Sequence, residues 1–161
     1  MQRILQWLLT IPLRWIRQPY SPRFYDAIAR LITTVPVEAV ILRQTTGGIE
    51  IFLQQRKSHE SYPGMWCCPG SVIRPGEEPF DVLHRVMKKE LNTDMVEADL
   101  VGVECCQETR GWFCEIVYLV TLDREPANGS WAPVDHLPPM ASNHAAIIPM
   151  AVHQLNREGL V

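Results

Sequence analysis

The chain has 161 residues, a length typical of a single domain, and 47% of them are hydrophobic, which is enough for a packed core. This composition excludes a disordered or fibrous protein. The formal net charge is only −3, so the chain lacks the overall basic character of nucleic-acid-binding proteins, and we expect no specific nucleic-acid partner.

The five cysteines are an odd number, and no signal peptide with a small-residue cleavage site is present, so a reducing, cytoplasmic location is expected. Four of the cysteines form two adjacent pairs, Cys67–Cys68 and Cys105–Cys106. Adjacent side chains on a strand point to opposite faces, which disfavours binding of one metal ion by both members of a pair. Cysteines that pack in the core are therefore a better interpretation than a zinc site.

Residues 1–34 differ in charge from the rest of the chain, because they carry five arginines against one acidic residue, Asp26. Within them, residues 1–18 place large apolar side chains at helical spacing. The apolar run is shorter than the roughly 20 residues of a membrane-spanning helix, and Pro12 and Arg14 interrupt it. A helix packed on the domain, a homodimer contact and a basic helix on a membrane surface remain open.

A second short helix is expected from Ser21 to Leu31, because serine is a good helix cap and a proline follows it. We therefore predict two parts. Residues 1–34 form an amphipathic, basic N-terminal helical extension, and residues 35–161 form the domain. The expected location is cytoplasmic, or membrane-peripheral if the extension binds a membrane.

Strand patterns begin after the extension. Residues 37–43 and 49–56 are rich in β-branched and aliphatic side chains, and the turn-forming residues 46–48 lie between them. This pattern predicts a β-hairpin. A polar loop at residues 57–61 and the segment Tyr62–Trp66 follow.

The stretch from Pro69 to Asn92 is a loop rich in glycine and proline that leads into a charged helix. Pro79 has the fixed φ angle that suits a first helical turn, and Glu77 precedes it at the positive end of the helix dipole. Asn92 tolerates the left-handed backbone that often ends a helix. A loop, a helix and a concentration of charges make this stretch the expected chemical centre.

This stretch resembles the signature of the Nudix family, G-x5-E-x7-R-E-U-x-E-E-x-G-U, in which U is a bulky aliphatic residue. When Ser71 is placed on the first glycine, four residues fall on their signature positions; these are Glu77, Arg85, Met87 and Glu90. Shifting the register by one residue in either direction loses the matches at Glu77 and Arg85 together. The resemblance therefore fixes the alignment, and the departures from the signature are real substitutions.

Besides Ser71 at the first glycine, other signature positions are changed: Val86 and Lys89 replace helical glutamates, and Asn92 replaces the closing glycine. In the family, this helix face presents carboxylates to Mg²⁺ or Mn²⁺, which bridges a diphosphate while water attacks phosphorus. Here Glu90 is the single carboxylate of the face. The ammonium of Lys89 would repel a cation at ~4 Å by about 4 kcal/mol per unit charge. The family metal cluster is therefore expected to be weak or absent.

The resemblance assigns the remaining site roles as follows. Glu77 and Glu90 are the candidate catalytic residues, Glu90 is the candidate metal ligand, and the cofactor is Mg²⁺ or Mn²⁺ if the chain is active, or none. Other carboxylates could compensate for the missing ligands; these are Glu77, Glu104, Glu108 and Glu115. Structural roles in the loop and helix are expected for Gly70, Ser71, Gly76 and Arg85.

Four residues are candidates for substrate binding. The resemblance places Arg56 near a substrate phosphate, and Lys89 could bind a phosphate in place of the missing cation. Lys89 could equally point to solvent or pair with an acid. Tyr62 and Trp66 could stack on a base, although a tryptophan beside a Pro-Gly loop is more often part of the core.

The rest of the chain completes the pattern of the family. Residues 100–108 and 112–122 are predicted strands, and residues 131–138 resemble the Nudix segment that precedes the last helix. That helix is expected from Asn143 to about Glu158. The resemblance implies an α/β fold, the Nudix-type α/β/α sandwich with a mixed β-sheet.

A second resemblance is weaker. The Gln-Gln-Arg sequence ending at Arg56, followed by Tyr62–Trp66, is similar to isopentenyl-diphosphate isomerase, a Nudix-fold enzyme with a catalytic cysteine after the tryptophan. Cys67 or Cys68 lies near that place, but Pro69 follows where the isomerase has a metal-binding histidine.

The function implied by the main resemblance is hydrolysis of a diphosphate linkage in a nucleoside diphosphate derivative, with activity weakened by the incomplete metal-binding signature. The alternative is a catalytically inactive Nudix module that binds a nucleotide-like small molecule or a protein partner.

Overall fold

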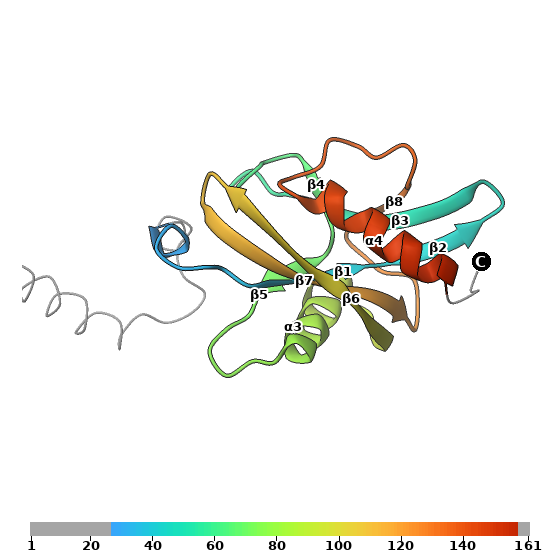
Figure 1. Cartoon of the computed structure of the whole chain (residues 1–161). Helices are drawn as coiled ribbons and strands as arrows, with labels where there is room; N and C mark the ends of the chain where they lie inside the picture. Colours follow the sequence, from blue (N-terminus) through green and yellow to red (C-terminus); the bar gives the residue numbers. More distant parts are fainter. Residues whose placement is uncertain (1–26, 158–161) are drawn as a thin grey trace, which may run out of the picture.

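The structure is a computed structural model that describes residues 27–157, which form two β-sheets and the helices around them (Figure 1). The strands of the first sheet are, in order, β5 (Gly70–Val72), β1 (Pro36–Val40), β7 (Gly111–Leu122) and β6 (Met95–Glu108). The strands of the second are β2 (Leu42–Thr45), β3 (Gly48–Gln55) and β4 (Trp66–Cys67), with β8 (Ser130–Pro133) beside β3.

The first sheet is mixed. Strand β1 runs parallel to β7 and antiparallel to β5, while β6 and β7 form a long antiparallel ribbon. All five residues of β1 are buried, because this strand lies inside the sheet and protein covers both of its faces. Strands that are covered on both faces have continuous rather than alternating apolar sequences, which explains the apolar run of β7.

Helix α3 (Pro79–Val86), which continues into the π-helical segment η1 (Met87–Leu91), and helix α4 (His144–Arg157) lie on opposite sides of the first sheet (Figure 1). Val82, Leu83 and Val86 of α3 pack on one face of that sheet. Ile147, Ile148 and Ala151 of α4 pack against residues of β1 and β7 on the other face and against β3 of the second sheet. The predicted α/β/α fold class with a mixed sheet is therefore confirmed.

The predicted hairpin needs a correction. Strand 37–43 is divided at Ile41: β1 joins the first sheet, and only β2 pairs with β3, with Thr45 opposite Gly48 at the turn. The amide of Phe52 donates to the carbonyl of Ile41 at 3.0 Å, so the hydrogen-bonded path continues through the division. The sequence shows a strand-forming run but contains no information on which partner each half of it pairs with.

Other predicted boundaries fit more closely. The predicted signature helix is present and ends at Asn92, which has the left-handed backbone expected of it, with φ of 52°. Strand β6 begins at Met95 rather than at residue 100 and contains register irregularities near both positions. Helix α4 ends at Arg157, where the description of the chain ends.

Most of the predicted N-terminal extension, including the helix at residues 1–18, lies outside the described residues. Residues 27–29 are helical, as expected for the C-terminal half of the predicted helix from Ser21 to Leu31. Within the described range, no helix is both long enough and apolar enough to cross a membrane.

The prediction that the cysteines only pack in the core is wrong for two of them. Cys105 of β6 and Cys114 of β7 form a disulfide across directly paired positions of the ribbon. Cys67, Cys68 and Cys106 are free. The sequence does not reveal this disulfide, because it depends on the register in which β6 and β7 pair. The conspicuous feature of the sequence is that Cys105 and Cys106 are neighbours, and this says nothing about Cys114.

Candidate functional site

The loop between β5 and α3 is fastened to the helix by a pair of opposite charges. Arg85 donates from Nε to Glu77 Oε1 and from Nη2 to Glu77 Oε2, both at 2.9 Å. The same guanidinium donates to Ser71 Oγ at 3.1 Å and to the carbonyl of Val72 at 3.2 Å. The hydrogen bonds from Arg85 hold the pKa of the Glu77 carboxyl below its ordinary value.

Both oxygens of Glu77 are therefore occupied by the arginine, and one of them also accepts from the backbone amide of Arg74 at 3.0 Å. This geometry fixes the shape of the loop. Gly76 lies in the same loop with φ of 84°, a left-handed conformation that glycine adopts without strain.

The helix face that carries the metal ligands in the signature lacks two of the expected carboxylates in this protein. Val86 is fully buried in the core between α3 and the first sheet, so its position belongs to the packing of the domain. Lys89 is exposed and forms no salt bridge with any residue in the range 27–157. Glu90 is also exposed. Partial loss of solvent around its carboxyl nevertheless raises the pKa of that group, and the charge of Arg85 acts in the opposite direction.

The donor set of this face does not fit the Mg²⁺ or Mn²⁺ cluster of the family. A hard divalent cation requires several oxygen ligands, and this face supplies one carboxylate and one ammonium. Glu77, which could have added a ligand from the loop, is held by Arg85 instead.

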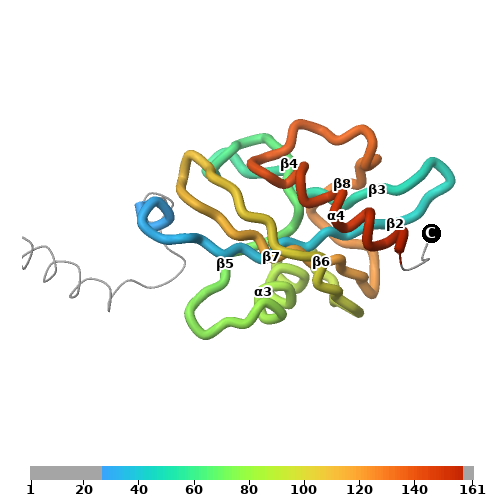
Figure 2. The backbone as a smooth tube through the Cα atoms, viewed as in Figure 1, coloured from blue at the N-terminus to red at the C-terminus, as the bar shows by residue number. Residues whose placement is uncertain are grey.

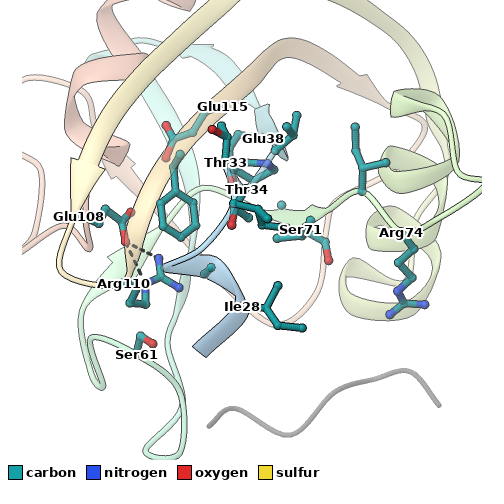
Figure 3. Close-up of a pocket in the computed structure, with 18 of the residues that line it drawn as sticks. Ile28, Thr33, Thr34, Glu38, Ser61, Ser71, Arg74, Glu108, Arg110 and Glu115 are labelled. Carbon is teal, nitrogen blue, oxygen red and sulfur yellow. Dashed lines mark hydrogen bonds and ion pairs between the residues drawn. The ribbon is translucent and has the colours of Figure 1, made fainter. Parts of the chain in front are cut away.

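A cavity of about 1020 Å³ lies beside this loop, between the first sheet and the loop that follows β3. Residues 70–77 line one side of it, and Arg56 and Glu60 line another. Glu108, Arg110 and Glu115 of the β6–β7 ribbon also contribute; Figure 3 shows Glu108 and Glu115 on one side and Ser71 and Arg74 on the other.

The four residues predicted to bind substrate are not gathered in one place. Arg56 lines the cavity, and its Nε donates to the carbonyl of Ser61 at 2.5 Å. Tyr62 lies behind the tip of the ribbon, where its hydroxyl donates to Glu108 Oε2 at 3.5 Å. Trp66 packs against the core beneath α4, and Lys89 is not part of the cavity lining.

The cavity is also lined by buried acidic and imidazole groups. Glu38 of β1, Glu115 of β7 and His144 at the start of α4 are all buried, and each has a polar side-chain atom without a hydrogen-bond partner. The Nδ1 atom of His144 lies 3.8 Å from Glu38 Oε2. Gly70 makes room for this carboxylate, because a Cβ atom there would overlap Glu38 Oε2 and lie 2.7 Å from the carbonyl oxygen of Val37.

Burial favours the neutral forms of these groups. It raises the pKa of Glu38 well above its ordinary range, and the nearby carboxylate of Glu115 adds to the effect. Burial, together with Glu108 and Glu104, raises the pKa of Glu115 to about 7. Burial lowers the pKa of His144 to about 4, and the charges of Arg56 and Arg110 act in the same direction. The contact between Glu38 and His144 is therefore not a strong ion pair at neutral pH.

Sequence reasoning missed Glu38 and His144 and gave Glu115 only a supporting part. The available sign was a single acidic residue inside an otherwise apolar strand, which is unusual because buried carboxylates are costly. Glu38 lies in Val37–Val40 and Glu115 lies in the run of β7.

Comparison with known proteins supports the same fold. A model of the NUDIX domain family matches residues 33–151. The structure is similar to a MutT NUDIX hydrolase from Burkholderia pseudomallei, with a TM-score of 0.65, 22% identity, and coverage of 74% of this chain and 98% of that one. No curated protein sequence matches the chain.

Two structures of Shewanella oneidensis NrtR are also similar. Its NUDIX domain complexed with ADP ribose has a TM-score of 0.63 and 19% identity, with 87% of this chain and 99% of that one covered. NrtR complexed with a 27mer DNA has a TM-score of 0.65 and 19% identity, with 77% of this chain covered, and the match spans only 63% of that protein. At these identities the similarity shows the fold. Because the family match covers most of the chain, this protein belongs to the NUDIX domain family.

Proposed function

We propose that this chain is a Nudix module that binds a nucleotide-like diphosphate ligand in the cavity, without the usual metal-dependent hydrolysis on the signature helix. The observation that carries the proposal is the state of that helix face. Val86 is part of the core, Lys89 presents a positive charge, and Glu77 is held by Arg85. A single carboxylate, Glu90, is left for a cation that needs several.

The cavity supports ligand binding. It is large enough for a nucleotide-sized molecule, since small-molecule sites commonly have volumes of ~300–1,000 Å³. Arg56 and Arg110 line it and can donate to phosphate oxygens, although Arg110 is paired with Glu108. The NUDIX domain of NrtR, which has the same fold, has been solved with ADP ribose, and this favours a ligand of that chemical class.

Binding is tested by calorimetric titration of the full chain with ADP-ribose and ADP in EDTA. We expect binding without added metal, and we expect Arg56→Gln to weaken it about tenfold or more, because a charge-assisted hydrogen bond to phosphate is lost. Arg124→Gln is the matched control, since this exposed arginine pairs with Asp94 and does not line the cavity. Failure of both ligands to bind, or equal effects of the two substitutions, would contradict the proposal.

A second candidate is a hydrolase with a rearranged metal site. It is favoured by the charges around Glu90: besides burial, Glu60 contributes to the raised pKa of the Glu90 carboxyl, and Glu90 contributes to the raised pKa of Glu38. The two candidates are separated by measuring phosphate release from a nucleotide panel with Mg²⁺ or Mn²⁺. Turnover by the wild type that disappears in Glu90→Gln would establish the hydrolase, whereas intact binding without turnover supports the first proposal.

A further inference from the structure

One face of the β6–β7 ribbon carries a ladder of acidic groups and a thiol. Side chains alternate along a strand, so Glu104, Cys106 and Glu108 share one face of β6, and Cys105 uses the other face for its disulfide. Glu115 lies directly opposite Glu104 on β7. The ribbon therefore brings three carboxylates and one free thiol together near its turn.

Three of these groups are close enough to share one ion. The Sγ atom of Cys106 and one carboxylate oxygen each from Glu108 and Glu115 lie within 4.8 Å of one another. Ligands around a tetrahedral ion with bonds of ~2.0–2.3 Å are separated by about 3.5 Å. Small side-chain rotations are enough to close this difference.

The acidic members of the cluster differ in how well the protein satisfies them. Glu108 already accepts from Arg110, Tyr62 and Ser142, so at least one of these donors would have to move for Glu108 to bind a metal ion. Glu115 receives no such help: it is 2% exposed, and its Oε2 has no hydrogen-bond partner. Like charges directly opposite one another destabilise a sheet, as Glu104 and Glu115 do here.

A bound cation would stabilise the thiolate of Cys106 and the ionised carboxylates together.

We propose that Cys106, Glu108 and Glu115 bind a divalent transition-metal ion of the zinc class. One thiolate and two carboxylates suit Zn²⁺ or Co²⁺ better than Mg²⁺, which prefers oxygen ligands alone. Three protein ligands leave a fourth position for water or for a ligand oxygen. Glu108 and Glu115 line the cavity, so a metal ion held by them would lie at the wall of the cavity (Figure 3).

This site is separate from the signature helix, and it does not depend on the function proposed above. Its ligands come from β6 and β7, whereas Glu90 belongs to η1. Metal binding at the two places can therefore be told apart by substitution.

The experiment is a Co²⁺ titration of the metal-stripped full chain, without thiol reductants, which would compete for the metal. We expect a thiolate-to-cobalt charge-transfer band that saturates at one equivalent and is abolished by excess Zn²⁺. Cys106→Ser should remove the band, and Glu115→Gln should weaken Co²⁺ binding at least tenfold. Glu104→Gln is the matched control, since it removes a charge from the same ladder but not one of the three ligands, and it should keep the band.

Glu90→Gln should also keep the band. The proposal is overturned if the wild type shows no band, if the band persists in Cys106→Ser, or if Glu90→Gln abolishes it. Thermal melting of each variant identifies loss of folding, and Glu115→Gln provides an independent ligand test if Cys106→Ser does not fold.

Discussion

At the scale of single residues, the buried acids are the most unusual feature of the protein. Glu38 and Glu115 lie in the interior beside His144, and atoms of all three lack hydrogen-bond partners. Such groups lower stability when they are charged, so burial favours their neutral forms. Gly70 is required beside Glu38, because any side chain there would displace the carboxylate.

Glu115 gives a pH-dependent prediction for the metal-free protein in EDTA. Its folded-state pKa of about 7 is above the ordinary value of 4.5, so the native state holds the proton more tightly than the unfolded state does. The free energy of unfolding should therefore fall as pH rises from about 4.5 to 7. In the Glu115→Gln variant this decrease should be smaller by up to ~3 kcal/mol. At pH 8 the variant should therefore be more stable than the wild type.

Urea unfolding of both proteins at several pH values measures the effect. Glu97→Gln, an exposed position on the same ribbon, is the control and should follow the wild type. If the free energy of unfolding falls between pH 4.5 and 7 by the same amount in the wild type and in Glu115→Gln, Glu115 is not responsible for the fall.

At the scale of elements, two units organise the site. The first is the loop and helix joined by Glu77 and Arg85, which keep the shape of the Nudix signature although two of its acids are absent. The second is the β6–β7 ribbon, whose tip lies beside the loop that joins β3 and β4 (Figure 2). The hydrogen bond between Tyr62 and Glu108 joins these two segments.

The disulfide of the ribbon should contribute to stability. Cys105 and Cys114 are nine residues apart, and closing a loop of this size in the unfolded chain is worth about 2–3 kcal/mol in the chain-entropy treatment. Replacing both by serine should lower the free energy of unfolding by about that amount in metal-free buffer.

Denaturant unfolding of the double variant and of the wild type, with and without reductant, tests the cross-link. The double variant is its own control, since reductant should lower the stability of the wild type and leave the variant unchanged. A structural disulfide would be contradicted if the wild type and the variant had equal unfolding midpoints both with and without reductant.

At the scale of the whole molecule, the large cavity lies against the first sheet, where β1, β5 and the β6–β7 ribbon line it together with the loops after β3 and β5. The cavity has charged walls of both signs, which suits a ligand that carries phosphate on one part and polar donors or a metal ion on another.

The membrane-surface alternative for residues 1–18 gives a direct prediction. If it holds, the full chain should bind vesicles that contain phosphatidylserine, because arginines and tryptophans favour an anionic interface. Removal of residues 1–18 should weaken this binding at least tenfold and leave the thermal melting of the domain unchanged. Vesicle binding that is absent from the full chain, or that is equal in both forms, would favour a packed helix or a dimer contact.

The sequence by itself determined the family and the fold class, because these depend on local patterns. Contacts and backbone preferences within one short segment explain the pairing of Glu77 with Arg85. They also explain the proline at the start of α3 and the left-handed backbone of Asn92. The sequence also showed that Val86 and Lys89 stand where the family has acids, which is the reason that hydrolysis was already in doubt.

Only the tertiary structure decided which distant residues meet. The pairing of Cys105 with Cys114 and the burial of Glu38 beside His144 follow from strand register and from the docking of α4 on the first sheet. Register and docking depend on contacts between segments far apart in the chain, which no local pattern encodes. For this reason the loop and helix were predictable, and Glu108 and Glu115 could be named as possible metal ligands, whereas their approach to Cys106 and the burial of Glu38 were not predictable.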